Sequence, residues 1–361
     1  MRKVGRGSPV APATPHLHAP LLSNATLDRS IRVLGSPASL DPLFRRLASG
    51  LPITLGVLGA SVGQNAGCLD QPGKRCMGYS GIGHRPKGWA VLDDALRPRA
   101  AERLRSAVAA AAFKQHKFVY DSQTYAKPGV AEADLAEDFG DAALADALRG
   151  LAGALAPALH ATCGIYSGDA AIKLQRNTSG AFPCHYDNAG PPSKRSVTAV
   201  LYLGRADGEA VEADDGGALC LAPFLRRRVR LRPLLNRLVL FKSDRVVHSV
   251  ERWRGAAARL CVSFWFDGEV NGELTLTRDR LRFSDWDAAA EFFSTSPLQR
   301  CLSRAVYDEA YVASIGAMRS DGEEAMLVGH ERVVATTVAS LRPLVEELRR
   351  RRSLVGPGLE L

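Results

Sequence analysis

The sequence predicts a mainly β fold with flanking helices, built around an antiparallel double-sheet barrel or sandwich. Two observations carry this prediction. Hydrophobic strand-like segments follow one another through the middle of the chain, with turn residues between them. The predicted helices lie before and after this run, so strands and helices do not alternate as they do in a doubly wound sheet. The strands are expected at 170–175, 181–187, 196–204, 217–223, 237–242 and 259–266.

The remaining elements frame this run of strands. An apolar stretch at 51–67 predicts a strand that enters a Gly/Ser turn. Proline near its start and an alanine-rich interior predict a helix at 93–112. A second helix is expected at 141–160, and helical periodicity returns around 285–315 and again at 323–352. The last stretch is amphipathic, which suits either bracing of the major sheet or dimerisation; the oligomeric state stays open.

Bulk composition indicates a soluble globular protein. The chain has 361 residues, of which 46% are hydrophobic and 24% charged, enough for one large domain with attachments or for two ordinary domains. No run approaches the roughly 18 apolar residues that a membrane-spanning helix needs, so no membrane span is expected. The seven cysteines are odd in number, scattered and without a CxxC pair, which favours a reducing intracellular compartment over disulfides or structural zinc.

Net charge does not by itself define a partner. The formal charge is +9, and much of the excess lies in two arginine-rich runs at 226–232 and 349–352. Such runs are more often solvated faces or tails than binding sites, so the sequence gives no strong nucleic-acid signal. Residues 1–27 contain no acidic residue, which is typical of an organelle transit peptide and equally of a disordered tail. We otherwise expect the cytoplasm or the nucleus.

The stretch PCHYDNAG places His185 and Asp187 two positions apart in a segment predicted to be extended. Residues i and i+2 of a strand project from the same face, so these two side chains can hold one object between them. Downstream, RLVLFKSDRVVHSV gives a strand, a turn at 243–244 and then His248. Two imidazoles and one carboxylate form the ligand set that leaves open positions on Fe(II).

A buried arginine is expected on the last strand, RLCVSFWFDG. Leu260, Val262, Phe264 and Phe266 share one face as a core stripe, and Arg259 lies on the opposite face. Where both faces are enclosed, a guanidinium needs an anion beside it, and a carboxylate matches its fork geometry. Taken singly, each of these residues is more often structural. Taken together, in order and on strands of the right phase, they indicate a functional site.

In these segments the sequence resembles the Fe(II)/2-oxoglutarate-dependent dioxygenases, in particular the prolyl 4-hydroxylase branch and, within it, the oxygen-sensing prolyl hydroxylases. The resemblance covers residues 170–268 and implies a double-stranded β-helix (jelly-roll) core. It also implies Fe(II), 2-oxoglutarate and O2 as reactants, ascorbate as a supporting reductant, and succinate and CO2 as products. The matching motifs are HYDN, RSVTAVLYL, DGGALCL, NRLVLFKSDRVVHSV and RLCVSFWFD.

By this resemblance His185, Asp187 and His248 would be the iron ligands, and Arg259 would bind the distal carboxylate of 2-oxoglutarate. The remaining roles fall on residues of neighbouring strands. Tyr202 and Ser263 would assist Arg259 with their hydroxyl groups, Trp265 would pack near the metal pocket, and Arg195 would lie near its mouth.

One departure concerns the cosubstrate. Where the relatives carry a tyrosine about ten residues before the first iron ligand, this chain has Gln175, and the loop at 188–194 also differs. The resemblance implies a peptide or protein substrate, most plausibly one that is hydroxylated at proline. Alternatives are a nucleic-acid or small-molecule oxygenase of the same chemistry and a non-catalytic module that keeps the fold. The nucleic-acid demethylases place an arginine where this chain has Trp265, which disfavours that branch.

A second, weaker resemblance lies at 53–68, where GVLGASVGQNAGC is similar to the first block of the SGNH (GDSL-type) esterases, with Ser61 as the nucleophile. The other residues that an esterase needs are missing, including an aspartate paired with a C-terminal histidine. A structural strand and turn is therefore favoured. We expect a disordered or targeting segment at 1–50, a region of unclear role at 51–112, the dioxygenase domain at 113–270 and a helical extension at 271–361.

Overall fold

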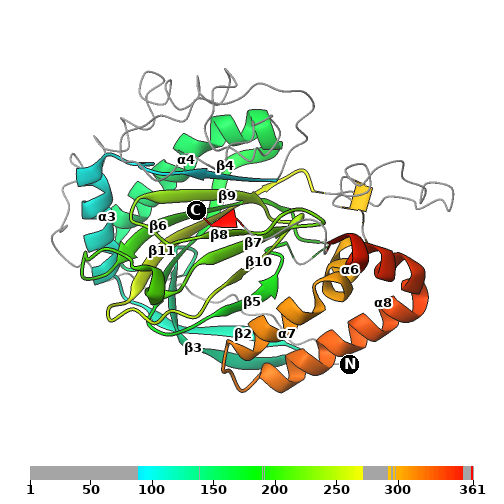
Figure 1. The fold of residues 1–361 in the computed structure, drawn as a ribbon. Coiled ribbons are helices and arrows are strands. Elements are labelled where there is room, and N and C mark those ends of the chain that lie inside the picture. Colours follow the sequence, from blue (N-terminus) through cyan, green and yellow to red (C-terminus); the bar gives the residue numbers. More distant parts are fainter. Residues whose placement is uncertain are drawn as a thin grey trace, which may run out of the picture.

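The computed structural model describes residues 88–137, 139–188, 190, 192–270, 292–293, 296, 298–352 and 359–360. These residues form two sheets and flanking helices, as the sequence predicts (Figure 1). The main sheet has the strand order β1-β9-β6-β11-β4-β3-β2, and the minor sheet has the order β12-β8-β7-β10-β5. The strands are β1 Trp89–Leu92, β2 Lys114–Tyr120, β3 Gln123–Asp134, β4 Ile165–Asn177, β5 Phe182–His185, β6 Arg195–Arg205, β7 Leu219–Pro223, β8 Val229–Leu231, β9 Arg237–Lys242, β10 Val246–Val250, β11 Arg259–Gly268 and β12 Leu359–Glu360. The helices are α3 Pro98–Ala110, α4 Ala142–Cys163, the 3₁₀ turn η1 Ala213–Asp215, α6 Gln299–Val306, α7 Asp308–Gly316 and α8 Glu323–Arg352.

The pairing pattern is that of a jelly roll. Every strand pair is antiparallel except β12 with β8. In the main sheet β11 pairs with β4 on one side and with β6 on the other. In the minor sheet β10 lies between β7 and β5, and His248 pairs directly with His185. The expected fold class, a mainly β jelly-roll core with flanking helices, is confirmed.

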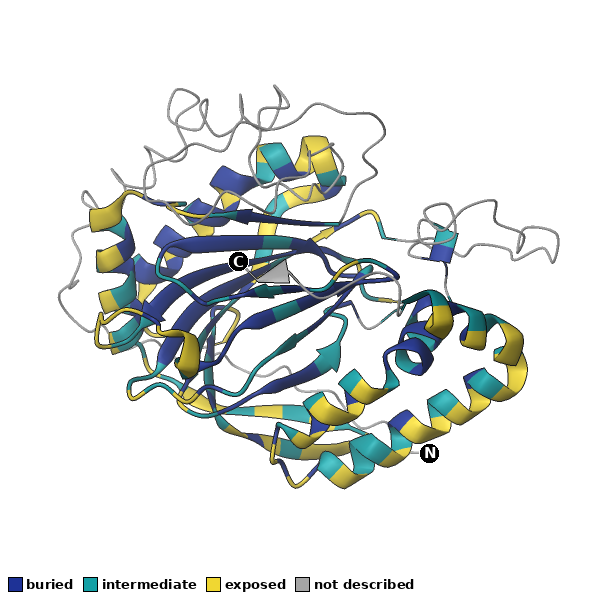
Figure 2. Ribbon diagram, in the orientation of Figure 1, coloured by how far each residue is buried: buried dark blue, intermediate teal, exposed yellow. Residues whose placement is uncertain are grey.

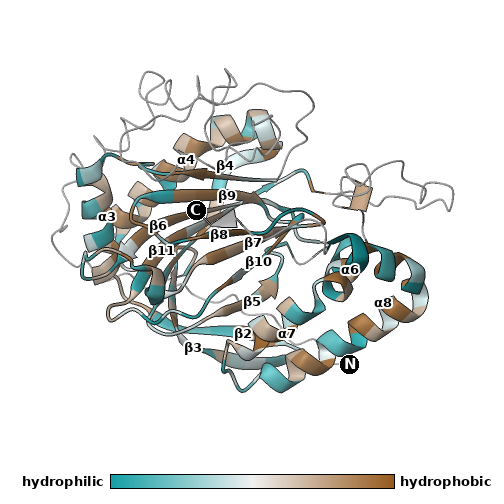
Figure 3. Ribbon diagram, in the orientation of Figure 1, coloured by the Kyte–Doolittle hydropathy of each residue, from teal (hydrophilic) through white to brown (hydrophobic). Residues whose placement is uncertain are grey.

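Alternation along the strands explains the two faces of the main sheet. On β11, Leu260, Val262, Phe264 and Phe266 enter the cluster beneath the helices, as their predicted stripe requires, whereas Cys261 enters the inner cluster between the sheets. Strands β2 and β3 are mostly exposed or half-buried, whereas the central strands β6, β9 and β11 are buried along most of their length (Figure 2). Their brown colour in Figure 3 reflects the same near-continuous hydrophobicity. Burial on both faces is expected for strands enclosed by helices on one side and a second sheet on the other.

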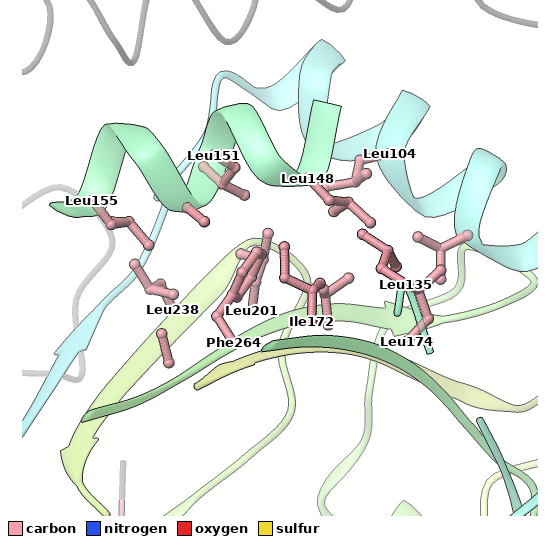
Figure 4. Close-up of a cluster of buried hydrophobic side chains, with 14 of the residues drawn as sticks. Leu104, Leu135, Leu148, Leu151, Leu155, Ile172, Leu174, Leu201, Leu238 and Phe264 are labelled. Carbon is pink, nitrogen blue, oxygen red and sulfur yellow. The ribbon is translucent and has the colours of Figure 1, made fainter. Parts of the chain in front are cut away.

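Helices α3 and α4 cover the outer face of the main sheet. Leu104 of α3 and Leu148, Leu151 and Leu155 of α4 pack against sheet residues that include Phe264 (Figure 4). The α4 helix begins after Asp141, whose side chain accepts a hydrogen bond from the backbone N–H of Leu144, and ends at Gly164 in the left-handed conformation. Within the described residues, α4 is the one helix long and apolar enough to cross a membrane, and its apolar side chains pack on the sheet.

The C-terminal helices pack mainly against the minor sheet, whereas the bracing hypothesis placed them on the major sheet. They also contact β3 of the major sheet, where Oγ of Ser320, between α7 and α8, donates to the carbonyl oxygen of Ala126 at 2.9 Å. Phe224 and Val247 of the minor-sheet side form one cluster with Leu302, Tyr311 and Val345 of α6, α7 and α8. The physical reason is that α3 and α4 already cover the outer face of the main sheet. The backbone N–H of Cys184 in β5 also donates to Oγ of Ser314 in α7, at 2.9 Å.

The elements of the structure differ from the predicted ones in several places. The region at 114–134, for which no element was predicted, forms β2 at the edge of the main sheet and β3 beside it. Strand β1 joins the opposite edge of that sheet by pairing with β9. The resemblance at 53–68, Ser61 and the segment at 1–27 lie outside the described residues. The division into domains stays a prediction. The five cysteines in the described part of the chain are free thiols.

Candidate active site

The two histidines approach each other because β5 and β10 are paired. His185 is the last residue of β5, and His248 lies at the centre of β10, directly opposite it in the register. Their ring centroids are 4.2 Å apart, and the His248 ring also lies 4.5 Å from the Phe241 ring. His248 is buried, while His185 is only partly buried. The His185 side chain, 35% exposed, is therefore the more accessible of the two.

Asp187 lies close to both histidines, but the backbone conformation that brings it there differs from the predicted strand. Strand β5 ends at His185, and Asp187 follows in a bend, so the two side chains do not share one face of a continuous strand. Its Oδ1 lies 3.4 Å from Nε2 of His185 and 3.5 Å from Nε2 of His248. The predicted proximity of the three side chains is found, but the bend produces it.

The three side chains fit one metal ion. Their ligand atoms all lie within 4.8 Å of one another. Metal–ligand bonds of about 2.1 Å that meet near right angles separate ligand atoms by about 3 Å, close to the observed distances between Oδ1 and the two Nε2 atoms. Two imidazoles and one carboxylate on one side of an ion form the donor set of non-heme Fe(II) oxygenases.

The protonation states suit metal binding. Nδ1 of His185 lies 2.7 Å from the carbonyl oxygen of Pro183, and Nδ1 of His248 lies 3.2 Å from that of Val246. Each Nδ1–H can therefore donate to a backbone carbonyl and leave the Nε2 lone pair for a metal. Burial and the neighbouring His248 lower the pKa of His185. Burial raises the pKa of Asp187, but the two imidazoles outweigh it and hold that pKa well below its usual range.

The second oxygen of the carboxylate is held by a hydroxyl chain. Oγ1 of Thr198 donates to Oδ2 of Asp187 at 2.7 Å, and it also contacts Oγ of Ser243 at 2.8 Å. Both hydroxyl-bearing residues are buried. Because Oδ2 is occupied, Oδ1 is the oxygen directed at the two imidazoles. Alternation along β6 puts Thr198 on the same face as Tyr202, but nothing in the sequence indicates this contact.

Arg259 has the features of a buried anion subsite. It is 1% exposed, and its Nη1 donates to the carbonyl oxygen of Gly217 at 2.8 Å. Its Nε is buried and has no hydrogen-bond partner among the described residues. The guanidinium carbon lies 5.5 Å from the centroid of the Tyr202 ring. A buried guanidinium with an unused N–H is costly, and a carboxylate would satisfy it. The residues present thus fit a dicarboxylic cosubstrate.

The neighbours of Arg259 line the same inner face. Tyr202 and Ser263 are buried on the adjacent strands β6 and β11. Burial raises the pKa of Tyr202, so its phenol stays protonated at neutral pH. Gln175 of β4 pairs with Cys261, which in turn pairs with Tyr202. Gln175, which stands where the relatives carry a tyrosine, therefore lies in the same row of paired residues as Tyr202, whose ring lies beside the Arg259 guanidinium.

Trp265 and Arg195 lie together at the other end of the inner face. The guanidinium carbon of Arg195 is 4.9 Å from the centroid of the Trp265 ring. The indole Nε1 is buried without a partner among the described residues. Trp265 pairs with Thr198, the residue that holds Asp187. Arg195 and Trp265 therefore lie close to the strand position that holds Asp187, and Trp265 presents an unused donor there.

Lys127 is a neighbour of the site that sequence reasoning missed. It lies on β3 and is 6% exposed, with its Nζ 3.6 Å from the centroid of the Phe182 ring. Burial lowers its pKa to about 7, although the charges of Glu132 and Asp187 oppose that shift. The sequence signal was the weak alternation of 123–134, which was not recognised as a strand.

Comparisons with known proteins agree with this geometry. Residues 172–267 match the model of the 2OG-Fe(II) oxygenase superfamily. A crystal structure of prolyl 4-hydroxylases from Phytophthora capsici is 33% identical, covers 74% of this chain and 89% of its own, and superimposes with a TM-score of 0.57.

Two further solved structures are more distant matches. A Trichoplax adhaerens prolyl hydroxylase in complex with a hypoxia inducible factor peptide fragment is 19% identical, covering 50% of this chain and 84% of its own, with a TM-score of 0.43. A Pseudomonas putida prolyl-4-hydroxylase is 22% identical, covering 50% and 93%, with a TM-score of 0.38. No curated protein matches the chain.

The jelly roll, the histidine–aspartate–histidine cluster and the buried arginine define a non-heme iron oxygenase. The chain belongs to the 2OG-Fe(II) oxygenase superfamily and is a 2-oxoglutarate-dependent dioxygenase.

Proposed function

We propose that the protein hydroxylates proline in a peptide or protein, with Fe(II), 2-oxoglutarate and O2 as reactants and succinate and CO2 as products. The observation that carries the proposal is the 33% identity over 89% of a prolyl 4-hydroxylase structure, combined with the iron-ligand geometry. The arrangement of Arg195 and Trp265 supports a peptide substrate, because an indole donor and a guanidinium suit a backbone carbonyl.

The roles of the residues follow from their contacts. His185, Asp187 and His248 would hold the iron, which supplies oxidation of an unactivated C–H bond by O2 at the expense of 2-oxoglutarate. Thr198 fixes the carboxylate of Asp187 so that Oδ1 faces the ion. Arg259 would seat the distal carboxylate of 2-oxoglutarate, with Tyr202 covering the guanidinium.

The test is a matched pair of peptide libraries, one with proline at a fixed position in varied contexts and one with alanine there. With iron, 2-oxoglutarate and O2, the proline library should gain one oxygen atom, and tandem mass spectrometry should place it on the proline. His185→Ala or Asp187→Ala should abolish both this gain and 2-oxoglutarate turnover. Asp146→Ala, which removes a carboxylate from an exposed helix pair with Arg149, should retain both.

Three results would overturn the proposal. Oxygen placed on other residues, or an equal gain in the alanine library, would make the proline assignment wrong. Wild-type turnover by the Asp187→Ala variant would make the metal assignment wrong.

The cosubstrate site is tested separately. Arg259→Ala should chiefly raise the KM for 2-oxoglutarate, because it removes the buried guanidinium, whereas Arg149→Ala on the surface of α4 should not. An unchanged KM in the Arg259 variant would contradict the assignment.

Ascorbate is proposed as the reductant that returns the iron to the ferrous state. Omission of ascorbate should leave the first turnover intact and reduce the number of turnovers that follow. Full progress curves without any reductant would contradict this role.

A further inference from the structure

A second cavity, separate from the oxygenase site, lies on the outer face of the minor sheet. Its volume is about 630 Å³, within the range of small-molecule sites. Strands β5, β7, β8 and β10 form one wall, and helix α7 forms another. Cys184 and Ser249, which line it, are the direct chain neighbours of His185 and His248. Because successive strand residues face opposite ways, the cavity lies behind the iron-ligand residues.

Positive charge dominates the lining. Four arginines contribute to it, against the two acidic residues Glu251 and Asp214. Glu251 is already neutralised by Arg230, with nitrogen–oxygen distances of 2.7 and 2.8 Å. Asp214 is exposed. The other three arginines are 228, 252 and 254.

Two of these guanidinium groups have unused hydrogen-bond donors. Nε of Arg228 and Nη1 of Arg252 are buried and have no partner in the described part of the chain. Arg228 and Arg352 also lie over the same Tyr307 ring, 5.3 and 4.7 Å from its centroid. Burial and the nearby Arg228 lower the pKa of Arg352. Buried donors and neighbouring cations of like charge are both stabilised by an anion.

The opposite wall is mainly apolar and is lined by small side chains. Ala310 and Ala313 of α7, and Ala317 directly after it, face Ala222 and Val247 of the sheet. Small side chains on both walls leave room beside the guanidinium groups. The cavity thus combines a cationic end with an apolar body, which suits a ligand of the same two-part character.

We propose that this cavity binds a small amphiphilic anion, a carboxylate, sulfonate or phosphate head group on a short apolar body. The head group pairs with Arg228 and Arg252, and the apolar body lies along the alanines of α7. The site is independent of the proposed substrate and of the iron-ligand residues.

The test is isothermal titration calorimetry on the full chain with the oxygenase site saturated by 2-oxoglutarate and manganese(II) without oxygen. Hexanesulfonate is the probe, methanesulfonate keeps only the head group, and hexanol keeps only the body. Hexanesulfonate should bind saturably, and each partial probe should bind at least about tenfold more weakly, because either half of the contacts is lost.

Protein variants test the contacts of the head group and those of the apolar body separately. The Arg228→Met/Arg252→Met double variant keeps the aliphatic stems and should weaken hexanesulfonate binding about 10- to 100-fold. Arg149→Met, on the surface of α4, should leave it unchanged. Ala313→Phe, at an exposed helix position facing the cavity, should weaken hexanesulfonate but leave methanesulfonate unaffected.

The proposal is overturned by three results. These are absence of saturable binding by the wild type, equal binding by the double methionine variant, and hexanol binding as tight as that of hexanesulfonate.

Discussion

At the scale of single residues, the site depends on contacts that fix the orientation of each ligand. Backbone carbonyls hold Nδ1 of both histidines, and Thr198 holds one carboxylate oxygen of Asp187. Outer contacts of this kind orient metal ligands and raise their basicity. The ligands themselves carry recognisable sequence spacing, but Thr198 carries none.

Thr198→Val should lower the affinity for iron about 10- to 100-fold while the fold is kept, because valine preserves shape and removes the hydroxyl that holds Asp187. Anaerobic titration with Fe(II) measures this change. Thr336→Val, which removes a hydroxyl bonded only to its own helix, is the matched control. Equal affinities in the wild type and the Thr198 variant would show that Asp187 is oriented without the threonine.

Lys127→Met should raise the melting temperature most at low pH. Burial lowers the pKa of Lys127 from 10.5 to about 7, so the unfolded chain holds this proton more tightly than the folded chain. Below about pH 7 the wild type therefore bears the full free-energy cost of burying the charged Lys127 side chain. That cost falls as pH rises toward the pKa of Lys127 in the unfolded chain.

Melting temperatures of the wild type and Lys127→Met at pH 6, 7.5 and 9 test this sign. The stabilisation should shrink from the first pH to the last. The exposed Lys114→Met variant on β2 should show no such trend. A gain that grows with pH would contradict the interpretation.

At the scale of elements, the edge of the main sheet is held by an ionic network on its inner face. Glu132 of β3 accepts from His116 of β2 at 2.7 Å and from Lys173 of β4 at 3.2 Å. Three strands are thereby joined through one carboxylate. Burial raises the pKa of Glu132, but its interactions with His116 and Lys173 outweigh that effect and lower it.

Glu132→Gln should destabilise the protein by about 1 kcal/mol at neutral pH, since it removes charge from partly buried hydrogen bonds. Because the folded pKa of Glu132 is lowered, its contribution is present above the unfolded value and is lost as pH falls through the folded one. The difference in melting temperature between variant and wild type should therefore narrow in acid.

Thermal unfolding at pH 7 and pH 4 measures this, with Glu102→Gln on the exposed surface of α3 as the control. A difference that widens in acid would be inconsistent with a stabilising Glu132 carboxylate.

At the scale of the whole molecule, the C-terminal helices and the jelly roll share one buried cluster. Leu302 of α6 is fully buried among residues from the minor-sheet side and from α8. A hydrogen bond from Cys184 to Ser314 further ties α7 to the strand that carries His185. The helices therefore support the strand beside the iron site.

Leu302→Ala should destabilise the entire protein by about 2 to 5 kcal/mol through the loss of buried contacts. We expect calorimetry to show a single unfolding transition at a lower temperature. Val312→Ala, at a position 42% exposed on α7, is the control and should change little. A separate early transition in the Leu302 variant would show that the C-terminal helices unfold independently of the jelly roll.

The sequence by itself determined the fold class and the chemistry-bearing residues. Alternation on β11 separates a helix-facing stripe from an inner face, so the sequence alone assigns Arg259 to the face opposite Leu260, Val262, Phe264 and Phe266. The strand 123–134 was missed because its few apolar positions do not alternate clearly, and its burial depends on tertiary neighbours.

Other features of the site follow only from the tertiary structure, because the local sequence pattern does not encode them. The bend that turns Asp187 toward both imidazoles, the contact from Thr198 and the burial of Lys127 all depend on segments distant in sequence. The same holds for the cavity behind β5 and β10, whose walls come from the minor sheet and α7. Side-chain periodicity is local, whereas desolvation and pairing are set by whichever elements pack together.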